Sequence, residues 1–226
     1  MHGVGPDLAR TPRRLKFAGN FLAWLADYLG TVRHGRRIAI VDAEGLRRFL
    51  ETRSNHVAQT SLYGYIRTRA GTRYPELFEN NEFIRSINIA KWQIWLACLS
   101  DLAVYAGGLI FREGRIPADR VAGLIRSAVA ASLASAGTPP DAGPAFADGA
   151  RRVIARLEGT DWSAVTDGEG PFCESPDALV EWAPIVDELK QYDAEIVKNS
   201  VRFRWQEIRR DLRRDLDAEA VAGPLR

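Results

Sequence analysis

The sequence predicts an all-α protein, an irregular helical bundle around one long apolar helix. Apolar residues recur at helical spacing along most of the chain, and the longest apolar run, 84–111, contains no proline. Only Ile38–Val41 has strand character, and we expect a short extended connector there without a partner strand. Of about seven predicted helices, the central one covers about Asn81–Phe111 and the long C-terminal one about Pro176–Leu216.

Composition places the chain among ordinary globular proteins. With 226 residues and a hydrophobic fraction of 46%, it can bury a sizeable core. The net charge of +2 demands no anionic partner, although arginine supplies 27 of the 31 basic residues. The two cysteines, Cys98 and Cys173, cannot form a disulfide framework or a zinc site, which favours a reducing, cytoplasmic compartment.

The segments before the central helix follow from capping and turn residues. Gly and Pro make 1–14 a flexible lead, and the next segment, Leu15–Gly30, has a helical apolar face. Asp42 is a good N-cap for a first short helix. We expect Ser54 to cap a separate helix that ends at Gly71.

Beyond the central helix, Pro117 suits the first turn of an alanine-rich helix. Residues 138–144 are rich in Pro and Gly, which predicts a linker. Ser175 and Pro176 predict the start of the last helical region. Pro184 lies near that start, where it is tolerated or kinks the helix. The predicted organisation is a lead at 1–14, a helical core at 15–137, a linker at 138–144, a C-terminal helical part of the same domain at 145–217, and a tail at 218–226.

The central run has two interpretations. Trp92–Phe111 is long enough to span a bilayer, and Lys91 and Arg112 bracket it. However, a helical projection gathers polar and small residues into one stripe, which suits a bundle centre where a neighbour approaches closely. We therefore favour a buried core helix. The stripe comprises Glu82, Ser86, Ala90, Gln93, Ala97, Ser100, Asp101, Gly107 and Gly108.

Asp101 is the charged residue in the middle of this apolar helix. A buried carboxylate must be paired, hydrogen-bonded or protonated. We expect its partner to be Lys91 on the same helix or an arginine from the 53–73 region. A structural ion pair is favoured over a functional site.

A second group of residues combines arginines with tyrosines near Gly71. Arginine forks bind phosphate or carboxylate well, but arginines also complement the negative end of a helix. The latter explanation is favoured. The candidate ligand-binding residues, if the group is a site, are Arg67, Arg69, Arg73, Tyr63 and Asp101.

The C-terminal helix carries an apolar stripe close to a coiled-coil pattern, with arginines and acids beside it. We expect the stripe to run through Val201, Trp205, Ile208, Leu212 and Leu216, extended upstream by Leu179, Trp182, Val186, Leu189 and Ile196. A face that packs on a partner or stays solvated is favoured over lipid, and nucleic acid comes last. The candidate partner-binding residues are Val201, Trp205, Arg209, Leu212 and Arg213.

These features favour a non-enzymatic interaction, scaffold or assembly protein that contacts a protein partner or itself. The first alternative is a membrane-associated protein that uses the 92–111 helix or the basic C-terminal helix, in which case the cytoplasmic protein is peripheral to a membrane. The second is an enzyme for a small or phosphate-bearing ligand, with Asp101 beside Arg67–Arg73. No catalytic, metal or nucleotide motif is present, so we predict no cofactor and no metal.

Overall fold

The computed structural model describes residues 39–223, and these form an all-α fold, as predicted. The lead at 1–14 and the helix expected at Leu15–Gly30 lie outside the described residues. The elements in chain order are α2 (Ala43–Ala70), the 3₁₀ helix η1 (Gly71–Arg73), α3 (Tyr74–Leu77), α4 (Asn81–Gly114), α5 (Ala118–Ala136), α6 (Ala145–Glu158), α7 (Glu174–Trp182), α8 (Asp187–Asp215) and α9 (Ala218–Ala222).

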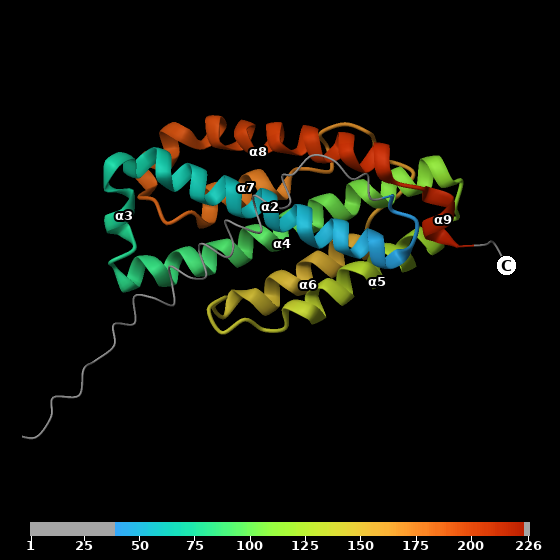
Figure 1. Ribbon diagram of the computed structural model, residues 1–226, viewed down its shortest axis with the longest axis horizontal. Coiled ribbons are helices and arrows are strands. Elements are labelled where there is room, and N and C mark those ends of the chain that lie inside the picture. The colour runs from blue at the N-terminus through green and yellow to red at the C-terminus, as the bar shows by residue number, and fades with distance from the viewer. Residues whose placement is uncertain (1–38, 224–226) are drawn as a thin grey trace, which may run out of the picture. The chain divides into compact units, whose positions relative to one another are not determined.

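Helices α2 and α4 lie against each other and form the middle of this unit (Figure 1). Helices α5 and α6 cover one side of the pair, while α7 and α8 cover the other. Each outer helix therefore has one side on the core and one side toward solvent, which is the arrangement that amphipathic helices favour.

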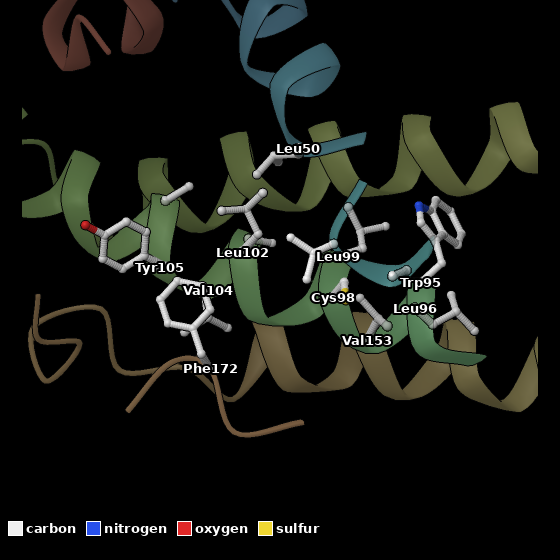
Figure 2. Packing of buried hydrophobic residues seen from close by; sticks show 14 of the residues in the cluster. Leu50, Trp95, Leu96, Cys98, Leu99, Leu102, Val104, Tyr105, Val153 and Phe172 are labelled. Atoms are coloured by element: carbon white, nitrogen blue, oxygen red, sulfur yellow. The ribbon is translucent and has the colours of Figure 1, made fainter. Parts of the chain in front are cut away.

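The long central helix is confirmed as α4. Its N-cap is Asn80, whose side-chain oxygen accepts the backbone N–H of Glu82 at 2.8 Å, and it ends before Arg115 in the left-handed region at φ 50°. Between these ends it is buried on most sides. Figure 2 shows its side chains enclosed by Leu50 of α2, Val153 of α6 and Phe172 of the loop after α6.

The small residues of α4 admit a close neighbour, as the projection predicts. A Cβ added at Gly107 would lie 2.2 Å from the ring of Trp162, and one added at Gly108 would lie 2.3 Å from Val165. Trp162 itself is buried. The loop between α6 and α7 therefore packs directly on the backbone of α4, which only glycine allows.

The two helices expected at the start of the described chain are one helix. Asp42 caps α2 by accepting the N–H of Gly45 at 2.6 Å, and Gly71 ends it at φ 56°, both as predicted. The N-cap assigned to Ser54 was wrong, because Ser54 is buried in the middle of α2. Serine lowers helix propensity only slightly, so it does not interrupt a helix that is packed on both flanks.

Proline divides the C-terminal helical region. The residue before Pro184 is disfavoured in α conformation, and Ala183 is extended at ψ 131°, so α7 ends there and α8 begins three residues beyond the proline. Ser175 is not an N-cap, because α7 already begins at Glu174. Residues 218–222, expected in a tail, form the short helix α9.

The strand-like segment has a partner after all. Ile40 forms an isolated parallel bridge with Leu216, in which its N–H donates to Asp215 O at 2.7 Å and its carbonyl accepts the N–H of Asp217 at 2.9 Å. Ile40 is buried. The expectation of an unpartnered connector was wrong, since a single bridge between such distant segments leaves no periodic signal in the sequence.

Candidate functional site

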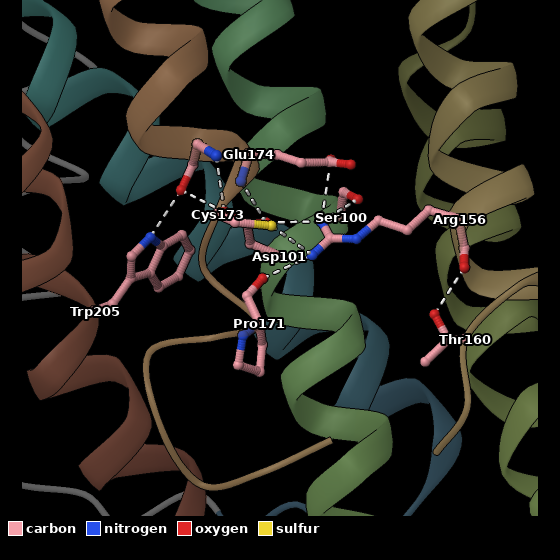
Figure 3. Close-up of polar contacts among 9 residues, drawn as sticks. Ser100, Asp101, Arg156, Thr160, Pro171, Cys173, Glu174 and Trp205 are labelled. Carbon is pink, nitrogen blue, oxygen red and sulfur yellow. Dashed lines mark hydrogen bonds and ion pairs between the residues drawn. The ribbon is translucent and has the colours of Figure 1, made fainter. Parts of the chain in front are cut away.

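Asp101 lies in the middle of α4 and is fully enclosed. Its Oδ1 accepts the backbone N–H of Glu174 at 3.1 Å, and its Oδ2 accepts the N–H of Ser175 at 2.8 Å and the Ser175 hydroxyl at 2.6 Å (Figure 3). These N–H groups are the first of α7, which have no partner inside that helix. The carboxylate therefore caps α7 from a different helix and sits at its positive end.

Arg156 of α6 is the cation that pairs with Asp101. Its Nη1 lies 2.7 Å from Asp101 Oδ1 and also donates to Ser100 Oγ at 2.9 Å. Its Nη2 donates to the carbonyl of Pro171 at 2.8 Å, and Glu174 Oε2 lies 3.1 Å from Nη1. One guanidinium thus joins α4, α6 and the loop that leads into α7 (Figure 3).

Trp205 of α8 completes this network. Its indole Nε1–H donates to Ser175 Oγ at 2.9 Å, and the same hydroxyl donates to Asp101. Trp205 is almost fully buried, with its ring 4.8 Å from that of Phe172 between centroids. Helices α4, α6, α7 and α8 therefore meet at one satisfied polar cluster, which fixes their relative positions.

The electrostatics of Asp101 reflect two opposing effects. Burial raises the pKa of this carboxyl from 3.8 to about 6, while Arg156 and the hydrogen bonds from Ser175 lower it. At neutral pH the group is ionised, with every oxygen already accepting hydrogen bonds. A carboxylate with no exposed surface and no unoccupied acceptor site leaves no room for a substrate, so the geometry is that of a structural cluster.

The partners expected for Asp101 were wrong. Lys91 instead lies 3.5 Å from Asp141 and over the ring of Trp92. Arg156 belongs to a short amphipathic helix 55 residues further along the chain, and its partner depends on tertiary packing. No local spacing could reveal it.

The arginines of the second group separate into different contacts. Arg69 pairs with Asp193 of α8, which also accepts the Tyr65 hydroxyl at 3.1 Å. Arg73 is exposed and lies 3.6 Å from Glu76, in the next turn of the chain.

Arg67 is exposed, and Tyr63 is half-buried. Within residues 39–223, no contact joins Asp101 to Arg67, Arg69 or Arg73. Ligand binding by these residues stays a prediction.

A shallow pocket does exist at another place, between α2, α4 and the end of α5. It encloses about 190 Å³ and is lined by Glu51, Asn55, Gln59, Lys91, Trp92, Trp95, Ser135 and Ala136. Ligand pockets usually enclose at least about 300 Å³. None of the predicted ligand-binding residues lines it.

The predicted partner-binding stripe of α8 faces the protein's own core. Val201, Trp205 and Leu212 are almost fully buried. Arg209 and Arg213 both reach Asp167 of the loop before α7, with Arg213 Nη1 2.7 Å from Asp167 Oδ2. An apolar stripe at heptad spacing looks the same whether it packs inside one chain or between chains, so the sequence could not separate these cases.

The opposite face of α8 carries a different apolar row, which we name the outer stripe. It consists of Leu189, Tyr192, Ile196 and Phe203, whose exposed fractions are 39%, 82%, 73% and 71%. Their spacings of three, four and seven place them on one side of the helix. Leu189 and Ile196 were expected to extend the stripe of Val201, Trp205 and Leu212, and this was wrong, because that stripe continues inward through Val197 while Leu189 and Ile196 lie on the exposed side. The sequence did contain a signal for this second row, because Tyr192 and Phe203 do not fit the spacing of the inward stripe.

Two further observations concern membranes and metals. Helix α4 is long and apolar enough to cross a membrane by length and composition, but 94% of its most apolar window is buried within the fold. In the part of the chain from 39 to 223, no group of three or more His, Cys, Asp or Glu side chains could hold a metal ion.

Comparison with known proteins gives no relative for this chain. No protein-family model, curated protein or solved structure matches it.

Proposed function

We propose that this chain is a non-enzymatic assembly protein that binds the helix of a partner protein through the outer stripe of α8. The observation that carries the proposal is the row of four large apolar side chains, three of them more than two-thirds exposed, on one side of one helix. Single exposed apolar residues are normal on protein surfaces. An aligned row is the pattern that a partner helix recognises, through anchors at i, i+3, i+7 and i+14.

The helix that presents this row is held firmly in place. Trp205 joins it to the Asp101 cluster, Asp193 joins it to Arg69 and Tyr65 of α2, and Lys198 lies 2.8 Å from Asp177 of α7. A pre-ordered surface loses little conformational entropy when it binds. This firmness favours recognition of a partner over a rearranging lid or hinge.

A lipid surface fits the outer stripe less well than a protein. Helices that lie on anionic membranes have basic residues along the polar borders of the apolar face. Beside the first half of the outer stripe stand the exposed acids Glu188 and Glu195. Insertion of α4 would require the loss of the core that encloses it.

The proposal is tested by a photo-crosslinking amino acid placed at Tyr192, with Arg126 on the exposed side of α5 as the control position. In the cells that produce the protein, we expect a discrete protein adduct from position 192 and none from position 126. Flotation of the purified protein with vesicles of anionic phospholipid tests the alternative that the outer stripe binds a lipid surface. Absence of a protein adduct at 192, or lipid adducts with vesicle flotation, would overturn the proposal.

A further inference from the structure

The charges along α8 are divided between its two halves. From Asp187 to Val201 the helix has four carboxylates and two lysines, whereas from Arg202 to Asp215 it has six arginines and three carboxylates. The outer stripe crosses the boundary between the acidic and the basic half, with Leu189, Tyr192 and Ile196 in the first and Phe203 in the second. A partner for the whole stripe must therefore present the opposite order of charges.

From this complementarity we infer that the outer stripe pairs with the outer stripe of a second copy of the chain, with the two α8 helices antiparallel. This inference rests on the proposed function and names its partner. Antiparallel pairing places the acidic half of each helix against the basic half of the other, whereas parallel pairing places like charges together. A self-complementary patch of this kind forms a closed two-fold dimer.

The heptad register specifies the contacts. Leu189, Ile196 and Phe203 occupy equivalent positions seven residues apart, and Tyr192 and Asn199 occupy the other positions of the seam. A two-fold axis between residues 197 and 198 sets Tyr192 against Phe203 of the second copy and Ile196 against Asn199 of the second copy. Each of the two central layers then combines one Asn199 with one Ile196, and the polar Asn lowers the stability of the seam.

The same register places a pair of opposite flanking charges, Glu195 and Arg202, next to the seam. Glu195 precedes the seam residue Ile196 and Arg202 precedes the seam residue Phe203, and antiparallel packing brings Glu195 of each copy opposite Arg202 of the other. Within residues 39–223 neither forms a salt bridge, and Arg202 only donates to Asn199 Oδ1 at 2.8 Å. In this register the residues that face each other run from 192 to 203, which is about 17 Å at a rise of about 1.5 Å per residue, so we expect a small interface and a weak, concentration-dependent dimer.

A charge exchange in the full-length protein tests the inference by sedimentation velocity over a wide concentration range. Glu195→Arg alone and Arg202→Glu alone each create like-charge contacts, and we expect each to weaken the dimer about tenfold or more. The double variant restores opposite charges, and its dissociation constant should return to within about threefold of the original. Circular dichroism checks that all three variants stay folded.

Cysteine crosslinking tests the direction of the helices, in a Cys173→Ser background because Cys173 is exposed. Residue 199 lies near the two-fold axis, so Asn199→Cys should form a disulfide with its own copy on oxidation. Two copies of residue 189 lie about 26 Å apart along antiparallel helices, so Leu189→Cys should not. Crosslinking of both variants would indicate parallel helices and overturn the inference.

A protein that stays monomeric at all concentrations, or a dimer that ignores the charge exchange, would also overturn the inference. Neither result contradicts the proposed function if Tyr192 crosslinks to a different protein. Adducts of Tyr192 that consist only of a second copy support both. The two proposals can therefore fail separately.

Discussion

Asp101 of α4 accepts the backbone N–H of Ser175 at 2.8 Å, so a carboxylate from one helix caps the start of another 74 residues away. The same pair is joined through the Ser175 hydroxyl, which in turn accepts the indole N–H of Trp205 on α8. The helix that presents the outer stripe is thus connected to the centre of the bundle by two hydrogen bonds in series. The polar cluster therefore holds in place the helix that carries the proposed binding surface.

Arg156→Gln should destabilise the fold strongly. The variant leaves the buried Asp101 carboxylate without its cation, and breaking a buried pair in this way costs about 3–5 kcal/mol. Urea unfolding at pH 7.5 measures the loss. The matched control is Arg151→Gln on the same helix, because Arg151 is exposed and its ion pair is with Asp148, which is exposed too. We expect a change below about 1 kcal/mol for the control, and equal losses for the two variants would contradict the role of Arg156.

Asp101 should stabilise the fold more at low pH than at neutral pH, whereas a carboxyl group with a lowered pKa does the reverse. Its pKa rises from 3.8 to about 6 on folding, chiefly through burial. The native state therefore binds the proton more tightly, and this contribution to the free energy of unfolding is fully present below about pH 4. It falls by about 3 kcal/mol as pH rises through 6, since one pKa unit corresponds to about 1.4 kcal/mol.

Other acids also change the stability with pH. Asp167 and Asp193 have lowered pKa values, so their contributions to stability are lost as the pH falls. Comparison with Asp101→Asn separates the contribution of Asp101 from theirs. The stability difference between the original chain and the variant should be larger at pH 4.5 than at pH 7.5. Urea unfolding at the two values provides the measurement. A difference that grows with pH would show that the ionised carboxylate is the form that folding prefers.

Prediction from the sequence succeeded where one helix supplies its own signal. The caps Asp42 and Gly71, the central helix from Asn81 and the glycines that admit a neighbour are all local features of this kind. The missing information concerned contacts between distant segments. Arg156 as the partner of Asp101 is set only when α6 packs on α4.

The two faces of α8 show why the candidate site was harder to predict than the fold. Both Trp205 and Phe203 are large aromatic residues in the same helix, yet one is almost fully buried and the other is 71% exposed. Periodicity shows that each belongs to an apolar row, but not which row meets the core. That choice depends on the neighbours Phe172 and Ser175, which come from another part of the chain.

Gly107→Ala should be destabilising although alanine favours helices. The added methyl group would lie 2.2 Å from the buried Trp162 ring, and such overpacking costs about 1–3 kcal/mol. Gly123→Ala in α5 is the control, because a Cβ there meets nothing within 4 Å. The control should gain about 0.5–1 kcal/mol from helix propensity. Thermal unfolding of both variants gives the comparison, and a gain for Gly107→Ala would mean that the loop does not pack on α4.

Substitutions two residues apart on α8 should separate its inner and outer faces. Trp205→Leu removes the ring packed on Phe172 and the hydrogen bond to Ser175, and we expect a loss of about 3 kcal/mol or more in the free energy of unfolding. Phe203→Ser removes an exposed side chain, so the loss should stay within about 0.5 kcal/mol. Urea unfolding at a protein concentration low enough for monomers compares them without the effect of dimers. Because the two residues differ by 200° around the helix at about 100° per residue, similar losses would mean that α8 is rotated from its described position, and the outer stripe would then lose its basis as a binding surface.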